Sequence, residues 1–397
     1  MSSFKTIEQI SVNNKTVLLR ADLNVPMKDG AVTDGARLVR LLPTLKELSQ
    51  AKAKIVILSH FGRPDGKPNE KYSLRAVAVE LEKIWGRKIA FASDCIGQIA
   101  TDAITALPFG HILVLENTRF YPGEESNDPA FAAQLAALGD IYINDAFSAA
   151  HRAHASTEAI AKLLPHAAGR LMEEELNALE KALGKPTKPV AALVGGSKIS
   201  TKLDLLENLV TKTDFLVLGG GMANTFLAAQ GLAIGKSLYE ANMLDTARAI
   251  STKAAKHNCR IVLPIDAVVA TALQVHIATQ TVSVKAIPVE TMMLDIGPQS
   301  EKEIAALLQR CKTVVWNGPL GAFEFPPFDH ATTAIAKIVA DLTKQGKILS
   351  VAGGGDTVSA LTNANVTESF SYVSTAGGAF LEWMEGKTLP GVAALEK

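Results

Sequence analysis

Polar and basic side chains follow several apolar segments in the first half of the chain. They are Asp22, Asn24, His60, Arg63, Arg119 and Arg152. An arginine presents a planar fork of donors that can grip a phosphate or a carboxylate at two points. We therefore expect the first half of the chain to bind a compact anion.

Glycine takes the equivalent positions in the second half. The glycines that follow apolar segments there are Gly195, Gly196, Gly219–Gly221, Gly318, Gly353–Gly355, Gly377 and Gly378. A glycine turn that opens a helix lets free N–H groups and the positive end of the helix dipole face a phosphate. The second half is therefore expected to bind a nucleotide.

The segment GGGDT is the most informative of these glycine clusters. It follows the apolar run KILSVA directly. It therefore predicts a helix start with phosphate-facing amides, and Asp356 as an oxygen ligand for Mg²⁺. None of the clusters completes the G-x-x-x-x-G-K-[ST] pattern of a P-loop or the G-x-G-x-x-G pattern of a dinucleotide-binding turn.

Several candidates of the first half also have a structural interpretation. Asp22 and Asn24 suit a turn, because both residue types favour turns. A single histidine at a strand end, such as His60, is more often structural than functional. Arg37, taken by itself, fits the polar face of a helix.

Further candidates leave similar alternatives open. Lys198 and Lys202 are predicted to lie one helical turn apart and to reach the same side, or else to form a solvated helix face. Glu324 could hold ribose hydroxyls or stand at a helix start. The segment HRAHAST has no Cys, Asp or Glu at ligand spacing, so a phosphate contact from Arg152 is favoured over a metal site.

Ten short apolar segments predict buried parallel strands. They are TVLLRADL, KIVILSH, HILVLEN, DIYIND, PVAALVGG, FLVLGGG, RIVLPID, TVVWNGP, KILSVAGGG and YVSTAGG. Segments with helical spacing, such as LVRLLPTLKELSQ and EKEIAALLQRC, lie between many of them. The alternation predicts an α/β fold of βαβ units in doubly wound sheets, where ligands bind beyond the carboxyl ends of the strands.

The length of 397 residues predicts two domains, since single domains most often hold about 100 to 150 residues. We place the boundary near LPHAAGR, with a first domain over residues 1–170. The following LMEEELNALEKALG has the acidic start and terminal glycine of an exposed helix that could connect the domains.

Composition excludes several classes of protein. Lysine plus arginine equals aspartate plus glutamate, 40 against 40, so no overall field favours nucleic acid or an anionic membrane. Cys95, Cys259 and Cys311 fit neither a disulfide framework nor a zinc site, which indicates a reducing cytoplasm. The N-terminus has no signal-peptide pattern. The long uncharged stretch over 215–235 contains too many glycines and polar residues for a membrane span and predicts a buried strand, turn and helix.

Nine segments, taken together, resemble the phosphoglycerate kinase family in order and spacing. They are RADLNVP, SHFGRP, ENTRF, HRAHAS, GGSK, GGGMANTF, NGPLGAFEF, GGGDT and STAGGA. The resemblance covers essentially the whole chain and implies two Rossmann-like domains that face a cleft and close by hinge bending. It also implies a cytoplasmic, monomeric enzyme of glycolysis that uses Mg²⁺ and transfers phosphate from 1,3-bisphosphoglycerate to ADP, giving 3-phosphoglycerate and ATP.

Motif matching to the family assigns roles to single residues. Phosphoglycerate would contact Asp22, Leu23, Asn24, Arg37, His60, Phe61, Gly62, Arg63, Arg119 and Arg152. The nucleotide would contact Gly195, Lys198, Lys202, Gly219, Gly220, Glu324, Gly354, Gly355, Asp356 and Thr357, with Asp356 also on the metal. The transferring phosphoryl group would be stabilised by Arg37, Lys198, Gly354 and Gly377. A nucleotide domain over 171–385 and a tail over 386–397 that packs on the first domain are implied as well.

The chain departs from the family pattern at two places. The family usually has a threonine followed by three glycines, whereas here Thr375 is followed by Ala376 and two glycines. Alanine would cost about 1 kcal/mol of stability if this position needs a positive φ, and little otherwise. Asp329 and His330 replace the usual lysine and glycine, for which we expect a surface effect only.

Two other classes of protein stay open at this point. A two-domain dehydrogenase lacks its dinucleotide fingerprint here. A two-lobed solute-binding protein lacks its export signal.

Overall fold

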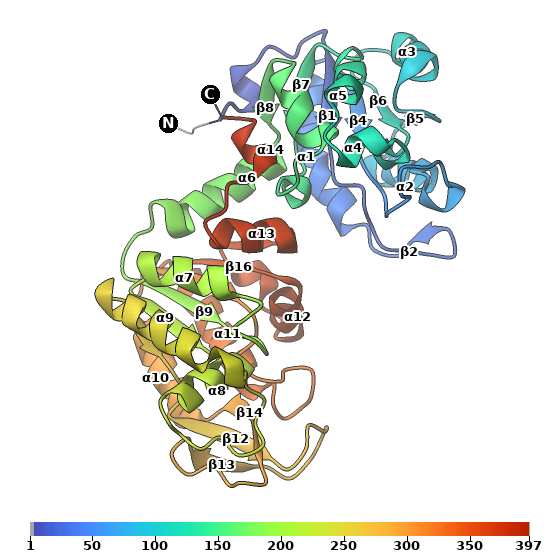
Figure 1. Ribbon diagram of the computed structural model, residues 1–397. Coiled ribbons are helices and arrows are strands. Elements are labelled where there is room, and N and C mark those ends of the chain that lie inside the picture. Colours follow the sequence, from blue (N-terminus) through green and yellow to red (C-terminus); the bar gives the residue numbers. More distant parts are fainter. Residues whose placement is uncertain (1–3, 397) are drawn as a thin grey trace. The chain divides into compact units, whose positions relative to one another are not determined.

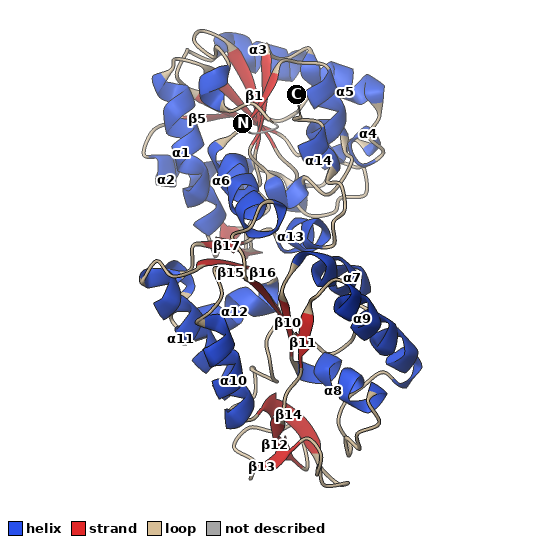
Figure 2. Cartoon of the chain, turned by 90° about the vertical axis from the view of Figure 1, so that its left-hand side faces the viewer, coloured by secondary structure: helices blue, strands red, loops and turns tan. Residues whose placement is uncertain are grey.

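The computed structural model describes residues 4–396, which divide into two compact units. Residues 4–176 and 388–396 form unit 1, and Asn177–Lys387 form unit 2. Each unit contains a six-stranded sheet whose neighbouring strands all run parallel. Helices lie on both faces of each sheet (Figures 1 and 2). The predicted α/β class and its two sheets are confirmed.

The sheet of unit 1 has the strand order β5-β6-β4-β1-β7-β8. Its strands are β1 (Thr16–Arg20), β4 (Lys54–Leu58), β5 (Ile89–Ala92), β6 (Ile112–Leu115), β7 (Ile141–Asn144) and β8 (His166–Ala168). Leu18 and Leu19 on β1 point to opposite faces and are both fully buried. Burial on both faces explains why a strand such as β6, with the sequence ILVL, is apolar throughout. A separate antiparallel pair joins β2 (Met27–Lys28) to β3 (Ala31–Val32).

The helices of unit 1 cover this sheet on two sides, with α1 and α2 on one and α4 and α5 on the other (Figure 2). They are α1 (Ala36–Gln50), α2 (Arg75–Trp85), α3 (Gly97–Ala106), α4 (Pro122–Glu125) and α5 (Pro129–Ala136). Leu41 and Leu45 of α1 and Leu81 of α2 are buried in one core cluster with Ile55 and Ile57 of β4. The apolar stripe of each of these two helices therefore faces the sheet.

The C-terminal segment also belongs to unit 1. Its helix α14 (Pro390–Ala393) packs on the segment after β7, where Gly391 N donates to Ala150 O at 2.8 Å. A Cβ at Gly391 would lie 2.9 Å from Ala150 Cα, so the close approach requires glycine. Lys397, the end of the expected tail, lies outside the described residues.

Helix α6 (Arg170–Leu179) runs across the division between the two units. It continues into a π-helical turn over Glu180–Gly184. Asp145, just after β7, accepts hydrogen bonds from Leu171 N at 2.8 Å and Met172 N at 3.1 Å. This buried carboxylate therefore satisfies free N–H groups in the first turn of the helix. A helix predicted over LMEEELNALEKALG is thus present.

The sheet of unit 2 has the strand order β11-β10-β9-β15-β16-β17. Its strands are β9 (Val190–Val194), β10 (Phe215–Leu218), β11 (Arg260–Val262), β15 (Thr313–Asn317), β16 (Leu349–Gly353) and β17 (Tyr372–Ser374). The helices are α7 (Leu203–Lys212), α8 (Gly220–Ala229), α9 (Leu244–Lys256), α10 (Pro298–Leu308), α11 (His330–Lys344), α12 (Gly355–Asn363) and α13 (Gly377–Met384). All ten predicted strands are present in the two parallel sheets.

The uncharged stretch 215–235 folds as predicted into strand β10, a glycine turn and helix α8. Within the described part of the chain, none of the helices has the length and apolar character needed to cross a membrane.

Unit 2 also contains a three-stranded antiparallel sheet that the sequence analysis missed. Its order is β13-β12-β14, with β12 (Asp266–Ala270), β13 (Gln280–Ser283) and β14 (Met292–Ile296). Val269 and Met293 of this sheet form a small core with Leu227 of α8 and Ile234.

Candidate functional site

The first group of candidate residues lies at the carboxyl ends of four adjacent strands of unit 1. Strands β6, β4, β1 and β7 are neighbours in the sheet. In parallel sheets the carboxyl ends meet at one edge, so the segments after these strands come together. This adjacency brings residues from 22 to 154 into one site.

Arg37, near the start of α1, is tied to the turn after β1. Its Nη1 lies 2.8 Å from Asp22 Oδ2 and 3.0 Å from Asn24 O. Asp22 Oδ2 also accepts a hydrogen bond from Ser148 Oγ at 2.5 Å. Asp22 Oδ1 accepts from Asn24 N at 3.0 Å, which is the turn contact typical of aspartate. The turn and the contact with arginine are therefore both present, and Arg37 keeps part of its guanidinium exposed.

The turn after β4 is joined to the turns after β1 and β6. Asn24 Oδ1 accepts from Gly62 N at 3.0 Å, and Leu23 N donates to Ser59 Oγ at 3.0 Å. Asn117 Oδ1 accepts from Phe61 N at 3.2 Å while its Nδ2 donates to Phe61 O at 2.7 Å. Asn117 was not a candidate in the sequence analysis, although it stands in the segment ENTRF.

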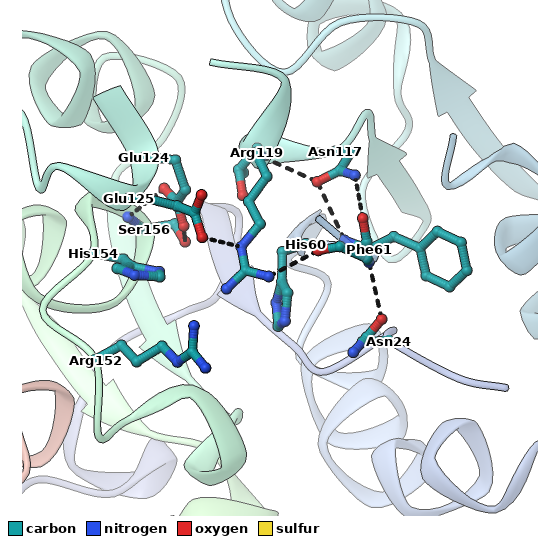
Figure 3. A network of polar contacts seen from close by, with 12 residues as sticks. Asn24, His60, Phe61, Asn117, Arg119, Glu124, Glu125, Arg152, His154 and Ser156 are labelled. Carbon is teal, nitrogen blue, oxygen red and sulfur yellow. Dashed lines mark hydrogen bonds and ion pairs between the residues drawn. The ribbon is translucent and has the colours of Figure 1, made fainter. Parts of the chain in front are cut away.

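Two arginines and two histidines gather around one space at this edge (Figure 3). Arg119 is 5% exposed, and its Nη1 donates to Gly62 O at 2.8 Å. Its Nε lies 3.3 Å from Glu125 Oε1. Arg152 stands beside His151 and points into the same space. Arg63, by contrast, is exposed on the turn after β4.

The electrostatics of this cluster keep the histidines neutral. Burial, together with the charges of Arg119, Arg20 and Arg152, lowers the pKa of His154 to about 4. Burial and the neighbouring arginines also lower the pKa of His60 well below its usual value. Burial lowers the pKa of Arg119 as well, against the opposing charge of Glu125. The positive charge of the cluster therefore comes from its arginines.

The second group of candidates lies at the carboxyl ends of β9, β10, β15, β16 and β17 in unit 2. Glycines let these segments approach closely: a Cβ at Gly195 would lie 1.6 Å from Pro319 O. Gly219 and Gly220 pack closely as well, Gly219 against Leu320 and Gly220 against Gly196. These glycines bring the strand ends together around the site.

Lys202 is held against these strand ends by its ammonium group. Its Nζ donates to Gly195 O at 2.8 Å and to Asn317 Oδ1 at 2.7 Å. Burial lowers the pKa of Lys202 to about 8, and the charge of Asp356 opposes that shift. Asn317 was also missed by the sequence analysis.

The expected helical spacing of Lys198 and Lys202 is wrong. Helix α7 begins at Leu203, so both lysines lie in the turn that precedes it. Lys202 bends back to the strand ends, whereas Lys198 is exposed. The glycine pair before Lys198 makes the chain turn before a helix can start, because Gly196 has a φ of +142°.

A hollow of about 260 Å³ lies between these segments. It is lined by Lys202, Asn317, Gly318, Gly354, Gly355, Asp356, Thr357, Gly377, Gly378 and Leu381. Both α12 and α13 begin at this hollow, as the GGGDT and STAGG segments predict. Two helix N-termini with free N–H groups make it suited to phosphate.

Two further positions test details of the sequence analysis. Ala376 has a φ of −95°, so alanine is not strained there and costs little. Glu324 is exposed in the turn after β15, outside the lining of the hollow. It does not stand at a helix start, because α11 begins at His330.

The residues around the hollow fit a metal ion that arrives with the nucleotide. Among the described residues, the side chains form no group of three or more His, Cys, Asp or Glu that could hold a metal by themselves. Asp356 is a single exposed carboxylate in the first turn of α12. Mg²⁺ is commonly bound by one or two carboxylates together with substrate phosphates, which is the arrangement that Asp356 could complete.

Comparisons with known proteins give a consistent result. A family model described as phosphoglycerate kinase matches residues 7–387. The chain is 61% identical over 393 residues to a phosphoglycerate kinase of Rhodospirillum centenum, covering 99% of each chain. It is 57% identical over 398 residues to one of Chelativorans, covering all of both. A solved phosphoglycerate kinase structure from Coxiella burnetii has a TM-score of 0.93 at 43% identity, covering 99% of this chain and 98% of that one.

Proposed function

Since the chain belongs to the phosphoglycerate kinase family and transfers a phosphoryl group between 1,3-bisphosphoglycerate and ADP, we propose that each unit holds one substrate. Residues 1–170 with the tail 386–397 would bind phosphoglycerate, and residues 171–385 would bind the nucleotide. The family membership excludes the dehydrogenase and solute-binding alternatives.

The phosphoglycerate site is supported by the convergence of guanidinium groups at the carboxyl edge of the first sheet. Arg119 and Arg152 face one space there (Figure 3). Arg37, in the first turn of α1, donates to Asn24 O in the turn after β1. A cluster of arginines with neutral histidines can hold both a phosphate and a carboxylate. The proposed contacts are Asp22, Leu23, Asn24, Arg37, His60, Phe61, Gly62, Arg63, Arg119 and Arg152.

The nucleotide site is supported by the hollow at the starts of α12 and α13. Asp356 would hold Mg²⁺ on the nucleotide phosphates, where the ion neutralises negative charge. Other proposed contacts are Gly195, Lys198, Lys202, Gly219, Gly220, Glu324, Gly354, Gly355 and Thr357. To reach a phosphate, the ammonium group of Lys202 would have to break its hydrogen bonds to Gly195 and Asn317, or share its N–H donors between them and the phosphate.

The chemistry needs no general base in the direction that consumes ATP. The attacking group is the carboxylate of 3-phosphoglycerate, which is already ionised near neutral pH. The demands on the protein are alignment of the reactants and stabilisation of charge on the transferring group. We assign these tasks to Arg37, Lys198 and the helix starts at Gly354 and Gly377.

We further propose that the enzyme acts as a monomer in a reducing cytoplasm. The three cysteines that the structure describes are buried and free of disulfide bonds. Burial raises the pKa values of the Cys259 and Cys95 thiols, so they have little thiolate character.

Substitution of Arg37 tests the proposed catalytic contact. We expect Arg37→Ala to lower kcat roughly 100-fold, which is the usual effect of removing one hydrogen-bond donor that stabilises negative charge in the transition state. Nucleotide affinity should stay unchanged, because Arg37 belongs to unit 1. Steady-state kinetics with 3-phosphoglycerate and ATP, and calorimetry with ADP, measure both quantities.

Arg87→Ala, which removes an exposed arginine of the same unit, is the matched control. A normal kcat in Arg37→Ala would contradict the role of Arg37.

A further inference from the structure

A chain of buried polar groups stands behind the phosphoglycerate site. Ser156 Oγ lies 2.5 Å from Glu124 Oε1 and 2.8 Å from Arg20 Nε. Arg20 Nη2 lies 2.9 Å from Nδ1 of His60. Arg20 is 1% exposed, and Glu124 and Ser156 are fully buried. We name this set the Glu124–Ser156–Arg20 chain.

The direction of every hydrogen bond in this chain follows from the guanidinium group. Arginine has only donors, so Ser156 Oγ accepts from Arg20 and gives its own proton to Glu124. Glu124 Oε2 accepts from Ser156 N at 3.0 Å, which fixes the carboxylate as the acceptor at this end. At the other end, Nδ1 of His60 must present its lone pair to Arg20.

A histidine whose Nδ1 accepts a hydrogen bond has only one form left. The imidazolium carries protons on both nitrogens, and the other neutral tautomer carries its proton on Nδ1. Neither form can accept from Arg20. The remaining form is neutral and carries its proton on Nε2.

We propose that Arg20, held by Ser156 and Glu124, is a positioning residue that fixes His60 as the neutral Nε2–H tautomer, so that Nε2 donates to an oxygen of phosphoglycerate. The inference rests on the proposed function, which places His60 in the phosphoglycerate site. Arg20 and its two partners act through His60 and need not touch the substrate.

The surroundings of His60 support this assignment. Burial is the largest cause that lowers the pKa of His60 well below its usual value. The charges of Arg20, Arg119 and Arg152 and the ring of His154 lower this pKa further. His60 therefore adds a donor to a site that is already positive without adding a further charge. The opposite tautomer would turn the lone pair of Nε2 toward an anionic ligand, which would repel it.

The tautomer can be measured directly in the ligand-free enzyme. Two-bond ¹H–¹⁵N correlation spectra distinguish a protonated ring nitrogen from one with a lone pair, and His60→Gln identifies the resonances. We expect Nδ1 of His60 to show the lone pair and Nε2 the proton from pH 6 to pH 8. A proton on Nδ1, or a doubly protonated ring at pH 7, would overturn the proposal.

Two variants test whether the Glu124–Ser156–Arg20 chain imposes this tautomer on His60. Arg20→Met removes the donor to Nδ1, and Ser156→Ala removes the group that holds Arg20 Nε. We expect a mixture of both tautomers in Arg20→Met and a smaller shift in Ser156→Ala. Arg20→Lys, which keeps a donor, should restore part of the Nε2–H form. The exposed Ser126→Ala is the matched control and should leave the spectrum unchanged. An unchanged tautomer of His60 in both Arg20→Met and Ser156→Ala would overturn the role of the Glu124–Ser156–Arg20 chain.

Kinetics of the same variants separate this inference from the proposed function. We expect Arg20→Met to raise KM for 3-phosphoglycerate roughly tenfold, the size of one hydrogen bond to a charged group, and to leave KM for ATP unchanged. A mixed tautomer with a normal KM would overturn the positioning role. A normal KM in His60→Ala, with the tautomer of the wild-type enzyme as expected, would instead contradict the proposed contact of His60.

Discussion

Gly354 shows how a single residue can connect backbone strain with ligand binding. It has a φ of +98° directly before α12, and a Cβ there would lie 2.8 Å from Asn317 Nδ2. We expect Gly354→Ala to destabilise unit 2 by about 1 kcal/mol or more and to weaken ADP binding, because the start of α12 must shift. Denaturant unfolding and calorimetry with ADP measure the two effects.

Gly346→Ala is the matched control for this prediction. Gly346 also has a positive φ, +66°, but a Cβ added there would meet no other residue within 4 Å beyond its chain neighbours, and it is outside the lining of the hollow. It should share the loss of stability and keep the affinity for ADP. Equal losses of affinity in both variants would contradict the special role of Gly354.

The sequence located most of the candidate site but not the residues that orient it. Residues that follow the strands were identified, because strand ends mark the ligand edge of a parallel sheet. Arg20 and Asn317 are the last residues of β1 and β15, and they were assigned to apolar strands. Glu124 and Ser156 lie far from Arg20 in sequence, and only the fold brings them to it.

At the scale of elements, a titratable group that accepts hydrogen bonds from the N-terminus of α6 predicts pH-dependent stability. Burial raises the pKa of Asp145 from 3.8 to about 6. Above about pH 6 the carboxylate is ionised in the folded and unfolded states, and the folded state bears the full cost of burying the charge. Below pH 3.8 both states are protonated and the cost is absent. The cost is therefore lost as the pH falls.

We expect the wild-type chain to gain roughly 2 kcal/mol of unfolding free energy relative to Asp145→Asn between pH 7 and pH 4. The asparagine is isosteric and has no proton to gain, so it lacks this gain. Denaturant unfolding of unit 1, followed for both proteins at several pH values, provides the measurement. Asp102→Asn, an exposed substitution on α3, controls for loss of a carboxylate. A constant difference between wild type and Asp145→Asn would refute the prediction.

The elements found from sequence differ from those missed in a physical way. Strands buried on both faces, such as β6 and β9, are continuous apolar runs and were identified. Strand β13 was missed because it is largely exposed, with the sequence QTVS, so its pattern does not stand out from a loop. Strand β8 is a three-residue HAA segment, which has no β-branched residue to indicate it.

At the scale of the whole molecule, the two proposed sites belong to different units. Phosphoryl transfer requires the reacting atoms to be about 3 to 3.5 Å apart. Since no base is needed, the main task left to the molecule is to bring the two substrates together. The proposed closure by hinge bending would perform that task, with α6 as the segment that crosses between the units.

Small-angle X-ray scattering tests this closure with the nonreactive pair of 3-phosphoglycerate and Mg·ADP. We expect the radius of gyration to fall when both ligands are present and to fall less with either one alone, because contacts across the two substrates exist only in the doubly bound state. An unchanged radius of gyration in the doubly bound enzyme would contradict hinge bending, and an equal fall with each ligand alone would show that closure does not depend on the pair.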